Sequence, residues 1–168
     1  MNENISNCEL DLPYPPIKTE GKNLYFASLL TNDYAGAVSE MSAVTKYSFQ
    51  HAVTTDRRTA EIMKCISLVE MRHLGFLSEI IRDFGGNPRI AVQSGCSTVF
   101  WSARYIAYDT DPRTYLRGNL SDERAAIASY RSRISQIDDR FVGKLLARII
   151  LDEENHIRIF SLLLEELF

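Results

Sequence analysis

Apolar side chains recur at helical spacing in four long stretches of the chain. The stretches cover about residues 23–53, 57–84, 121–137 and 140–168. In the first of them the apolar stripe consists of Phe26, Leu29, Leu30, Ala37, Val44 and Tyr47. Residues spaced by three and four positions share one face of a helix, so each stretch predicts an amphipathic helix whose apolar face is turned to a common core. The pattern therefore predicts an all-α fold.

Polar and helix-breaking residues separate the four stretches. The separators are Thr54-Thr55-Asp56, Gly85-Gly86-Asn87-Pro88, Ser121 or Asp122 as a cap of the third helix, and Asp138-Asp139 as a turn and a cap of the fourth. Residues 89–118 lack the helical period and carry several aromatic side chains. We expect a long crossover with one or two short helices in this segment, because the four helices would then form two helical hairpins.

The beginning of the chain differs from the rest. Residues 1–21 are polar and contain Leu12-Pro13-Tyr14-Pro15-Pro16, which cannot be helical. We therefore expect an extended N-terminal arm over residues 1–21, followed by one bundle domain over residues 22–168. Such an arm either moves freely or lies along a neighbouring subunit.

Composition excludes several classes of function. A net charge of −3, with arginines scattered among acidic residues, provides no basic stripe for a phosphate backbone, so nucleic acid is not expected as a partner. No apolar run approaches 18 residues and the N-terminus does not resemble a signal peptide, so we expect neither a membrane partner nor export. Cys8, Cys65 and Cys96 have no paired spacing, which predicts reduced thiols in a cytoplasmic protein.

Charged residues interrupt the apolar stripes in a pattern that occurs twice. In each half a lone Glu is followed thirty residues later by Glu-x-x-His, and the two halves are offset by 83 positions. The residues concerned are Glu40, Glu70 and His73 in the first half and Glu123, Glu153 and His156 in the second. A carboxylate in an apolar face needs a partner.

The spacing places these groups at one level of the bundle. The expected turns near residues 55 and 138 lie fifteen residues from each Glu, so both Glu side chains of a hairpin lie roughly 22 Å from its turn at 1.5 Å per residue. Glu and His at positions i and i+3 share a helix face. Four carboxylates and two imidazoles could thus converge on a pair of transition metals. Salt bridges on helix surfaces are the alternative explanation.

The repeated pattern, with the segments 33–43 and 150–156, resembles the rubrerythrin branch of the ferritin-like superfamily and, more distantly, manganese catalases and spore-coat proteins. The resemblance implies a ferritin-like four-helix bundle and two bound metal ions, with iron first and manganese as the alternative. It implies that the metal ligands are Glu40, Glu70, His73, Glu123, Glu153 and His156. Glu70 and Glu153 would bridge both ions, and a homodimer is expected.

The chain also departs from that family. Typical rubrerythrins have a further carboxylate one turn after the lone Glu of the third helix, where this chain has Ala126. They often carry a rubredoxin module, whose Cys-x-x-Cys motifs are not found in this sequence. The more symmetric ligand set is closer to that of bacterioferritin-like sites.

Other residues are candidates for supporting roles. Tyr47 and Tyr130 each follow a lone Glu by seven residues, so they could hydrogen-bond the bridging carboxylates or relay electrons, or they could be core aromatics. Asp152 could hold a ligating histidine through its second ring nitrogen. His51 is expected at a helix end. Asp33 could line an entrance to the site, although a solvated helix face is the simpler interpretation.

The leading hypothesis is a dinuclear-metal oxidoreductase that acts on hydrogen peroxide or dioxygen. The alternatives are iron binding and storage, a structural coat-type role, and a bundle whose site holds no metal in the cell. The sequence does not identify an electron donor.

Overall fold

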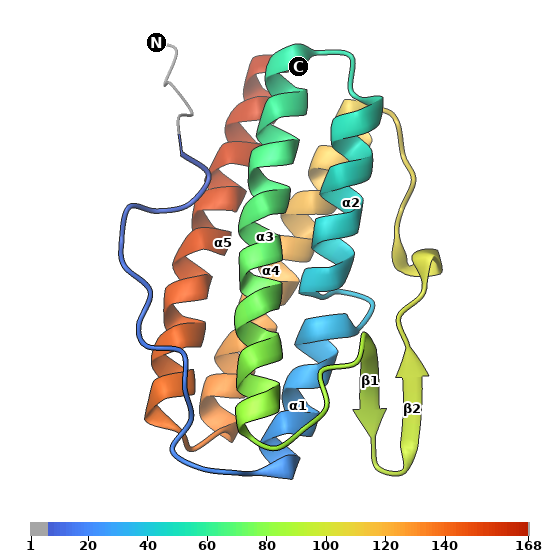
Figure 1. Cartoon of the computed structure of the whole chain (residues 1–168). Helices are drawn as coiled ribbons and strands as arrows, with labels where there is room; N and C mark the ends of the chain where they lie inside the picture. Colours follow the sequence, from blue (N-terminus) through green and yellow to red (C-terminus); the bar gives the residue numbers. More distant parts are fainter. Residues whose placement is uncertain (1–6, 168) are drawn as a thin grey trace.

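The computed structural model describes residues 7–167, apart from the side chain of Ser94, as a four-helix bundle (Figure 1). Its helices are α1 (Leu24–Ala35), α2 (Glu40–Val53), α3 (Arg57–Asp83), α4 (Pro112–Gln136) and α5 (Arg140–Leu167). Helices α1 and α2 together form the first long element, α2 packs along α3, and α4 packs along α5. This arrangement confirms the predicted bundle of two hairpins joined by a crossover. None of the helices in the described part of the chain has the length and apolarity to cross a membrane.

The first helical stretch is broken, so the prediction of one continuous helix over residues 23–53 was wrong. Helix α1 ends at Ala35 and α2 begins at Glu40. Ser39 caps α2, because its side chain accepts a hydrogen bond from the backbone N–H of Ser42, and the Ser42 hydroxyl in turn donates to the backbone oxygen of Gly36. Residues 36–39 are small or apolar and gave no sign of the break in the periodic pattern.

The two hairpin turns lie where the sequence predicts them. Asp56 caps α3 by accepting from the backbone N–H of Thr59 at 2.7 Å. Asp139 accepts from the backbone N–H groups of Phe141 and Val142 at the start of α5. These side chains satisfy backbone donors that the first helical turn leaves free, and they fix the register of each hairpin.

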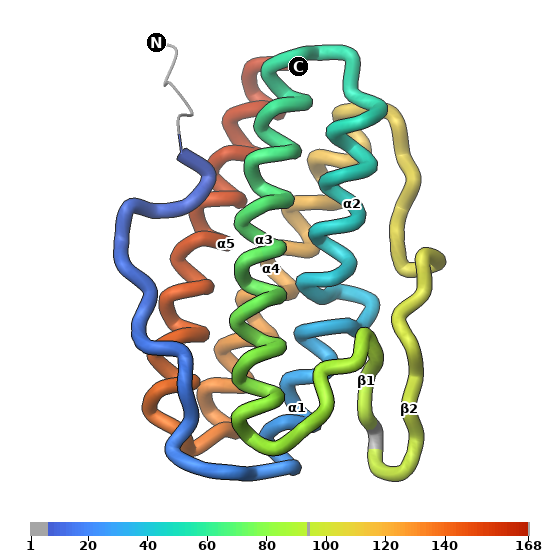
Figure 2. The backbone as a smooth tube through the Cα atoms, viewed as in Figure 1, coloured from blue at the N-terminus to red at the C-terminus, as the bar shows by residue number. Residues whose placement is uncertain are grey.

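The crossover contains a β-hairpin that the sequence did not predict. Strands β1 (Ala91–Ser94) and β2 (Ser97–Phe100) are antiparallel, and the 3₁₀ helix η1 (Ala103–Tyr105) follows. The tube in Figure 2 runs along the outside of α1 and α2 in this segment. Helix α4 begins at Pro112 rather than near residue 121, because Asp111 caps it and proline suits the first helical turn. The predicted start of the third helix was therefore wrong.

Residues 7–22 lie along α3 and α5 of their own chain, which differs from both expected positions of the arm (Figure 1). Arg148 of α5 donates to the backbone oxygens of Leu10 and Leu12, and the backbone N–H of Leu10 donates to Asp152. Cys8 forms a disulfide with Cys65 of α3, while Cys96 is free and exposed. The prediction of three reduced thiols was therefore wrong. Residues 1–6 lie outside the described residues.

The apolar core consists of two clusters that lie on opposite sides of the level of Glu40 and Glu70. One cluster contains Leu30, Leu77 and Ile149, and the other contains Met63, Leu116 and Phe160. Along each long element, the residues of one cluster precede the charged positions and the residues of the other cluster follow them. The bundle therefore holds its polar groups in a layer between two dry regions.

The break between α1 and α2 depends on Gly36. A Cβ atom at this position would lie 2.5 Å from the backbone oxygen of Asn32. We expect Gly36→Ala to lower the free energy of unfolding by about 1–3 kcal/mol, because the backbone must shift to relieve the overlap. Gly143→Ala in α5 is the matched control, since a Cβ atom there meets no atom within 4 Å. Urea denaturation of both variants checks this. A Gly36→Ala variant as stable as the unmodified protein would show that the break tolerates a side chain.

Candidate metal centre

The six charged residues of the repeated pattern lie together in the middle of the bundle. Their exposed fractions are all 3% or less. They form two overlapping groups, in each of which one oxygen or nitrogen atom per residue lies within 4.8 Å of the others. The first group is Glu40, Glu70, His73 and Glu153, and the second is Glu70, Glu123, Glu153 and His156. Glu70 and Glu153 belong to both groups, so each could contact two ions.

Both imidazoles present the Nδ1 atom to the carboxylates. His73 Nδ1 lies 3.2 Å from Glu153 Oε1 and 3.3 Å from Glu70 Oε2. His156 Nδ1 lies 2.9 Å from Glu153 Oε2 and 3.0 Å from Glu70 Oε1. The lone carboxylates are farther away, with Glu40 Oε2 3.8 Å from His73 Nδ1 and Glu123 Oε1 3.9 Å from His156 Nδ1. Each histidine thus has two shared carboxylates and one of its own.

Burial and the neighbouring charges together determine which groups of this layer hold protons when no cation is bound. Burial, together with the charge of Glu70, raises the pKa of Glu40 and of Glu123 well above the usual carboxyl value. Burial alone would lower the pKa of both histidines, but the neighbouring carboxylates outweigh it and raise the pKa of His73 and His156 well above the usual value. The metal-free layer therefore retains protons between its carboxylates and imidazoles.

Several polar atoms of the layer lack a hydrogen bond to any described residue. They are Glu70 Oε1, His73 Nδ1 and His156 Nε2. Glu70 Oε1 and His73 Nδ1 still lie within ion-pair distance of the groups named above, but a buried polar atom that makes no hydrogen bond costs free energy. Glu70 Oε1 and His73 Nδ1 point into the groups defined above, where a cation would satisfy them. A mixed set of carboxylate oxygens and imidazole nitrogens suits iron, manganese or zinc, so the residues fit a pair of such ions.

Tyr47 and Tyr130 connect the two hairpins at this layer. The hydroxyl of Tyr47 in α2 donates to Glu123 in α4, and the hydroxyl of Tyr130 in α4 donates to Glu40 in α2. Each tyrosine thus contacts the lone Glu of the other hairpin, rather than Glu70 or Glu153. Burial, with the adjacent carboxylate, raises the pKa of both hydroxyls well above the usual tyrosine value. Both remain hydrogen-bond donors at neutral pH.

Asp152 contacts the second ring nitrogen of His73, as hypothesised from its position. Asp152 Oδ2 lies 3.3 Å from His73 Nε2 and accepts from Arg148 Nη1 at 2.6 Å and from the Tyr14 hydroxyl at 2.7 Å. Burial opposes the charge of Asp152, but hydrogen bonds from His73, Arg148 and Tyr14 hold its pKa well below the usual value. A charged carboxylate behind the ring fixes the orientation of His73. Tyr14 of the arm thus helps to hold Asp152, and through it the His73 ring, in place.

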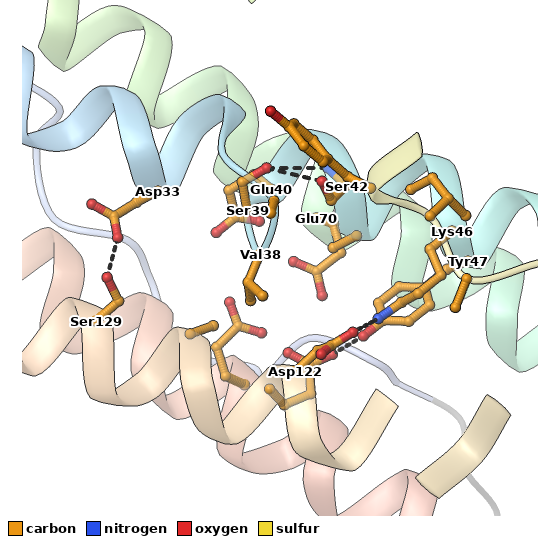
Figure 3. Close-up of a pocket in the computed structure, with 18 of the residues that line it drawn as sticks. Asp33, Val38, Ser39, Glu40, Ser42, Lys46, Tyr47, Glu70, Asp122 and Ser129 are labelled. Carbon is orange, nitrogen blue, oxygen red and sulfur yellow. Dashed lines mark hydrogen bonds and ion pairs between the residues drawn. The ribbon is translucent and has the colours of Figure 1, made fainter. Parts of the chain in front are cut away.

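A cavity of about 260 Å³ opens beside the layer on the side of α2 and α4 (Figure 3). Glu40, Glu70, Glu123 and Glu153 reach its wall, while the segment 105–107 of the crossover covers part of it. Ala126 also lines the cavity, so the position where typical rubrerythrins have a carboxylate adds space here. A small molecule could reach the carboxylate face of the layer through this cavity.

Asp33 and Lys46 lie at opposite ends of the cavity, and each belongs to a charged pair (Figure 3). Asp33 is buried, accepts from Ser129, and pairs with Arg133 Nε at 2.7 Å, so the simpler interpretation of a solvated face was wrong. Lys46 Nζ pairs with Asp122 Oδ2 at 2.7 Å. Lys46 was not predicted from the sequence, although a lysine six residues after Glu40 on a helix with a buried face is a usable signal.

His51 lies in the last turn of α2. Its Nδ1 atom lies 2.8 Å from the backbone oxygen of Ala60 in α3. It therefore connects the two helices near their turn, as expected for a helix-end residue, and it belongs to neither group of candidate ligands.

Comparison with known proteins gives consistent matches. The model of the Rubrerythrin family matches residues 35–164. A probable manganese catalase from Clostridium acetobutylicum is 24% identical over 162 residues, covering 86% of this chain and 72% of that protein. A bacterioferritin from Desulfovibrio desulfuricans is 27% identical over 128 residues, covering 73% of this chain and 66% of that protein. The crystal structure of KatB, a manganese catalase from Anabaena PCC7120, superposes on this chain with a TM-score of 0.85. The superposition covers 95% of this chain and 80% of that one at 22% sequence identity, so the two proteins share a fold.

The shared position of Glu70 predicts a difference between carboxylate variants. We expect Glu70→Gln to reduce metal binding at both groups, whereas Glu40→Gln should weaken only the group that contains His73. Elemental analysis after loading and dialysis measures the ions bound per chain. Glu154→Gln is the control, since this neighbouring carboxylate is exposed and pairs with Arg131. Retention of two ions by Glu70→Gln would rule out a shared role for Glu70.

The protonation of the layer predicts how metal binding depends on pH. Ions must displace protons from the histidines and carboxylates, so binding weakens as the pH falls. At an ion concentration about 100 times Kd, the expected stabilisation of about 2.7 kcal/mol would raise Tm by roughly 5–10 °C for a domain of this size. We expect this shift to grow from about pH 5 to about pH 9, because the raised pKa values of His73 and His156 keep both imidazoles protonated through the usual histidine range. Scanning calorimetry of chelator-treated protein with and without Mn²⁺ measures it, and an unchanged Tm at both values would contradict metal binding.

Proposed function

The chain belongs to the rubrerythrin family, and from this we propose that it is a dinuclear-metal oxidoreductase acting on hydrogen peroxide or dioxygen. The observation that carries the proposal is the pair of overlapping ligand groups that share Glu70 and Glu153. Each group combines three carboxylates with one imidazole, so one iron or manganese ion fits in each. When bound, two such ions supply the two-electron chemistry that cleavage of an O–O bond requires.

The protein's own residues would hold and orient these ions. Glu70 and Glu153 would lie between them, and the shared ligands would set their spacing. Asp152 would keep His73 in the tautomer that presents Nδ1 to an ion, because its carboxylate accepts a hydrogen bond from the Nε2–H group. Four carboxylate charges match the charge of two divalent cations, so the filled layer would be neutral before counting any bound oxidant.

The tyrosines would position the lone carboxylates. Tyr47 and Tyr130 donate to Glu123 and Glu40, so each occupies one lone pair of its carboxylate. Because both hydroxyls keep their protons at neutral pH, they would hold these carboxylates without competing for an ion. Their place in the cavity wall also puts them beside an incoming oxidant.

The cavity supports a small oxidant as the substrate. Its volume of about 260 Å³ is larger than a molecule of peroxide or dioxygen, and carboxylates from both groups line it. Ala126 leaves open the position that a further carboxylate occupies in typical rubrerythrins. We therefore propose disproportionation or reduction of peroxide at a symmetric ligand set that lacks this further carboxylate.

Iron binding and storage is the second candidate function. The similarity to the bacterioferritin from Desulfovibrio desulfuricans favours it. A storage protein would oxidise Fe²⁺ and retain the product, whereas an enzyme would return to its starting state after each turnover. The two functions therefore differ in whether peroxide is consumed repeatedly.

A turnover assay tests the proposed function. We expect Mn-loaded or Fe-loaded protein to consume many equivalents of hydrogen peroxide per chain, and Glu70→Gln to lose most of this activity because it disturbs both ligand groups. Peroxide loss and oxygen release are measured together, with Glu154→Gln as the control. Consumption that stops after about one equivalent both with and without an added dithiol reductant, with iron retained, would contradict the oxidoreductase and support storage.

A further inference from the structure

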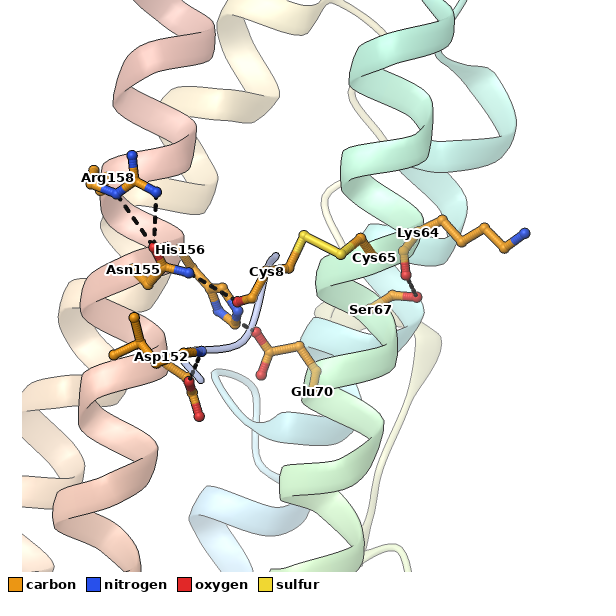
Figure 4. Close-up of a disulfide and its surroundings, with 10 residues drawn as sticks. Cys8, Lys64, Cys65, Ser67, Glu70, Asp152, Asn155, His156 and Arg158 are labelled. Carbon is orange, nitrogen blue, oxygen red and sulfur yellow. Dashed lines mark hydrogen bonds and ion pairs between the residues drawn. A yellow bond between two sulfur atoms is a disulfide. The ribbon is translucent and has the colours of Figure 1, made fainter. Parts of the chain in front are cut away.

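The structure places a pair of cysteines next to the metal centre. Cys8 of the arm and Cys65 of α3 form a disulfide with Cα atoms 6.0 Å apart (Figure 4). Cys65 precedes Glu70 by five residues on the same helix, a rise of about 7.5 Å. The backbone oxygen of Cys8 accepts from Asn155 Nδ2 at 3.1 Å, and Asn155 precedes His156 on α5. The disulfide thus contacts both helices that carry Glu-x-x-His.

Packed core connects the disulfide to the ligand layer. Cys8 is 1% exposed and belongs to the apolar cluster that also contains Tyr47 and Val69. Tyr47 in turn donates to Glu123 of the layer. The sulfur pair and the candidate ligands therefore occupy one continuous buried region of the bundle.

The arm does not depend on the disulfide for its position. Leu10 and Tyr14 donate to Asp152, and Arg148 donates to the backbone oxygens of Leu10 and Leu12. The guanidinium of Arg148 also lies 4.4 Å from the ring centre of Tyr14. These contacts would keep Cys8 facing Cys65 after the S–S bond is broken. The pair can therefore open and close without large movement of the chain.

A groove gives solvent access to one of the two sulfur atoms. A cavity of about 320 Å³ lies over Cys65 and is also lined by Lys64, Leu68, Val69 and Arg72. Cys65 is partly exposed, whereas Cys8 is buried. An incoming thiolate would therefore attack Cys65, and Cys8 would be the leaving sulfur.

We infer that Cys8 and Cys65 are a redox-active dithiol that supplies two electrons for peroxide reduction at the adjacent centre, and that a dithiol reductant regenerates it through the groove over Cys65. The inference rests on the proposed function. In the first step the O–O bond of one H₂O₂ breaks, the two thiols lose two electrons and form the S–S bond, and their two protons complete two water molecules. In the second step the reductant breaks the S–S bond and leaves as its own disulfide.

Thiol counting under limiting peroxide tests the inference. The protein carries Cys96→Ser, which removes the exposed thiol, and is reduced anaerobically with dithiothreitol, freed of it, and loaded with Mn²⁺ or Fe²⁺. One equivalent of H₂O₂ is added slowly, so that little free peroxide is present to return electrons to the centre. We expect loss of both remaining thiols and recovery of the Cys8–Cys65 peptide pair by mass spectrometry, at least about tenfold faster than in metal-free protein, because protein thiols that are not activated react slowly with peroxide by themselves.

Other outcomes separate this inference from the proposed function. Intact thiols in metal-loaded protein that consumes peroxide would overturn the inference and leave the oxidoreductase in place. Equal rates of thiol loss with and without metal would also overturn it, because the centre would then play no part. Metal-loaded protein that consumes no peroxide would overturn both.

Cysteine variants test the assigned roles of the two sulfur atoms. We expect Cys8→Ser to retain a mixed disulfide on Cys65 after treatment with oxidised glutathione, and Cys65→Ser to form little adduct on the buried Cys8. Intact-mass measurement of folded protein distinguishes them. Equal modification of both variants would contradict regeneration through the groove.

Discussion

Burial of four carboxylates at one level of an apolar bundle is the constraint on which the rest of the structure depends. Such groups repel one another and lose hydration, so they must share protons, pair with imidazoles or bind cations. In this fold each histidine pairs with the shared carboxylates Glu70 and Glu153, and a tyrosine hydroxyl donates a hydrogen bond to each lone Glu. The two apolar clusters shield the layer along the bundle axis, and the cavity beside α2 and α4 leaves its carboxylate face open.

The irregular parts of the chain serve this layer. The break at residues 36–39 puts Glu40 in the first turn of α2, where the helix dipole favours a negative charge. Trp101 of the crossover donates to Ser42 at 2.9 Å and so attaches the crossover to the same break. On the opposite side, the arm reaches Asp152 and through it His73. Segments outside the four long elements thus help to place Glu40 and His73, the two candidate ligands that belong to the first group alone.

The sequence predicted the parts of this structure that depend on local periodicity. Helix faces, the turns at Asp56 and Asp139, and the convergence of all six charged residues followed from spacing alone. The break after Ala35 could not be predicted, because apolar and small residues continue the pattern through it. The partners of Tyr47 and Tyr130 also escaped prediction, since a seven-residue spacing fixes the face of a helix but not which neighbouring helix that face meets. The disulfide joins residues 57 positions apart, and only the path of the arm brings them together.

The contacts behind the two histidines make the duplicated halves chemically unequal. His73 has a carboxylate, a guanidinium and a phenol behind its ring, whereas the equivalent of Asp152 in the other half is Val69, and His156 Nε2 has no hydrogen-bond partner among the described residues. A carboxylate behind an imidazole makes it a more basic ligand. A sequence that repeats its candidate ligands with equal spacing thus encodes two groups whose histidines differ in basicity, so two bound ions would differ in reduction potential even if they were the same element.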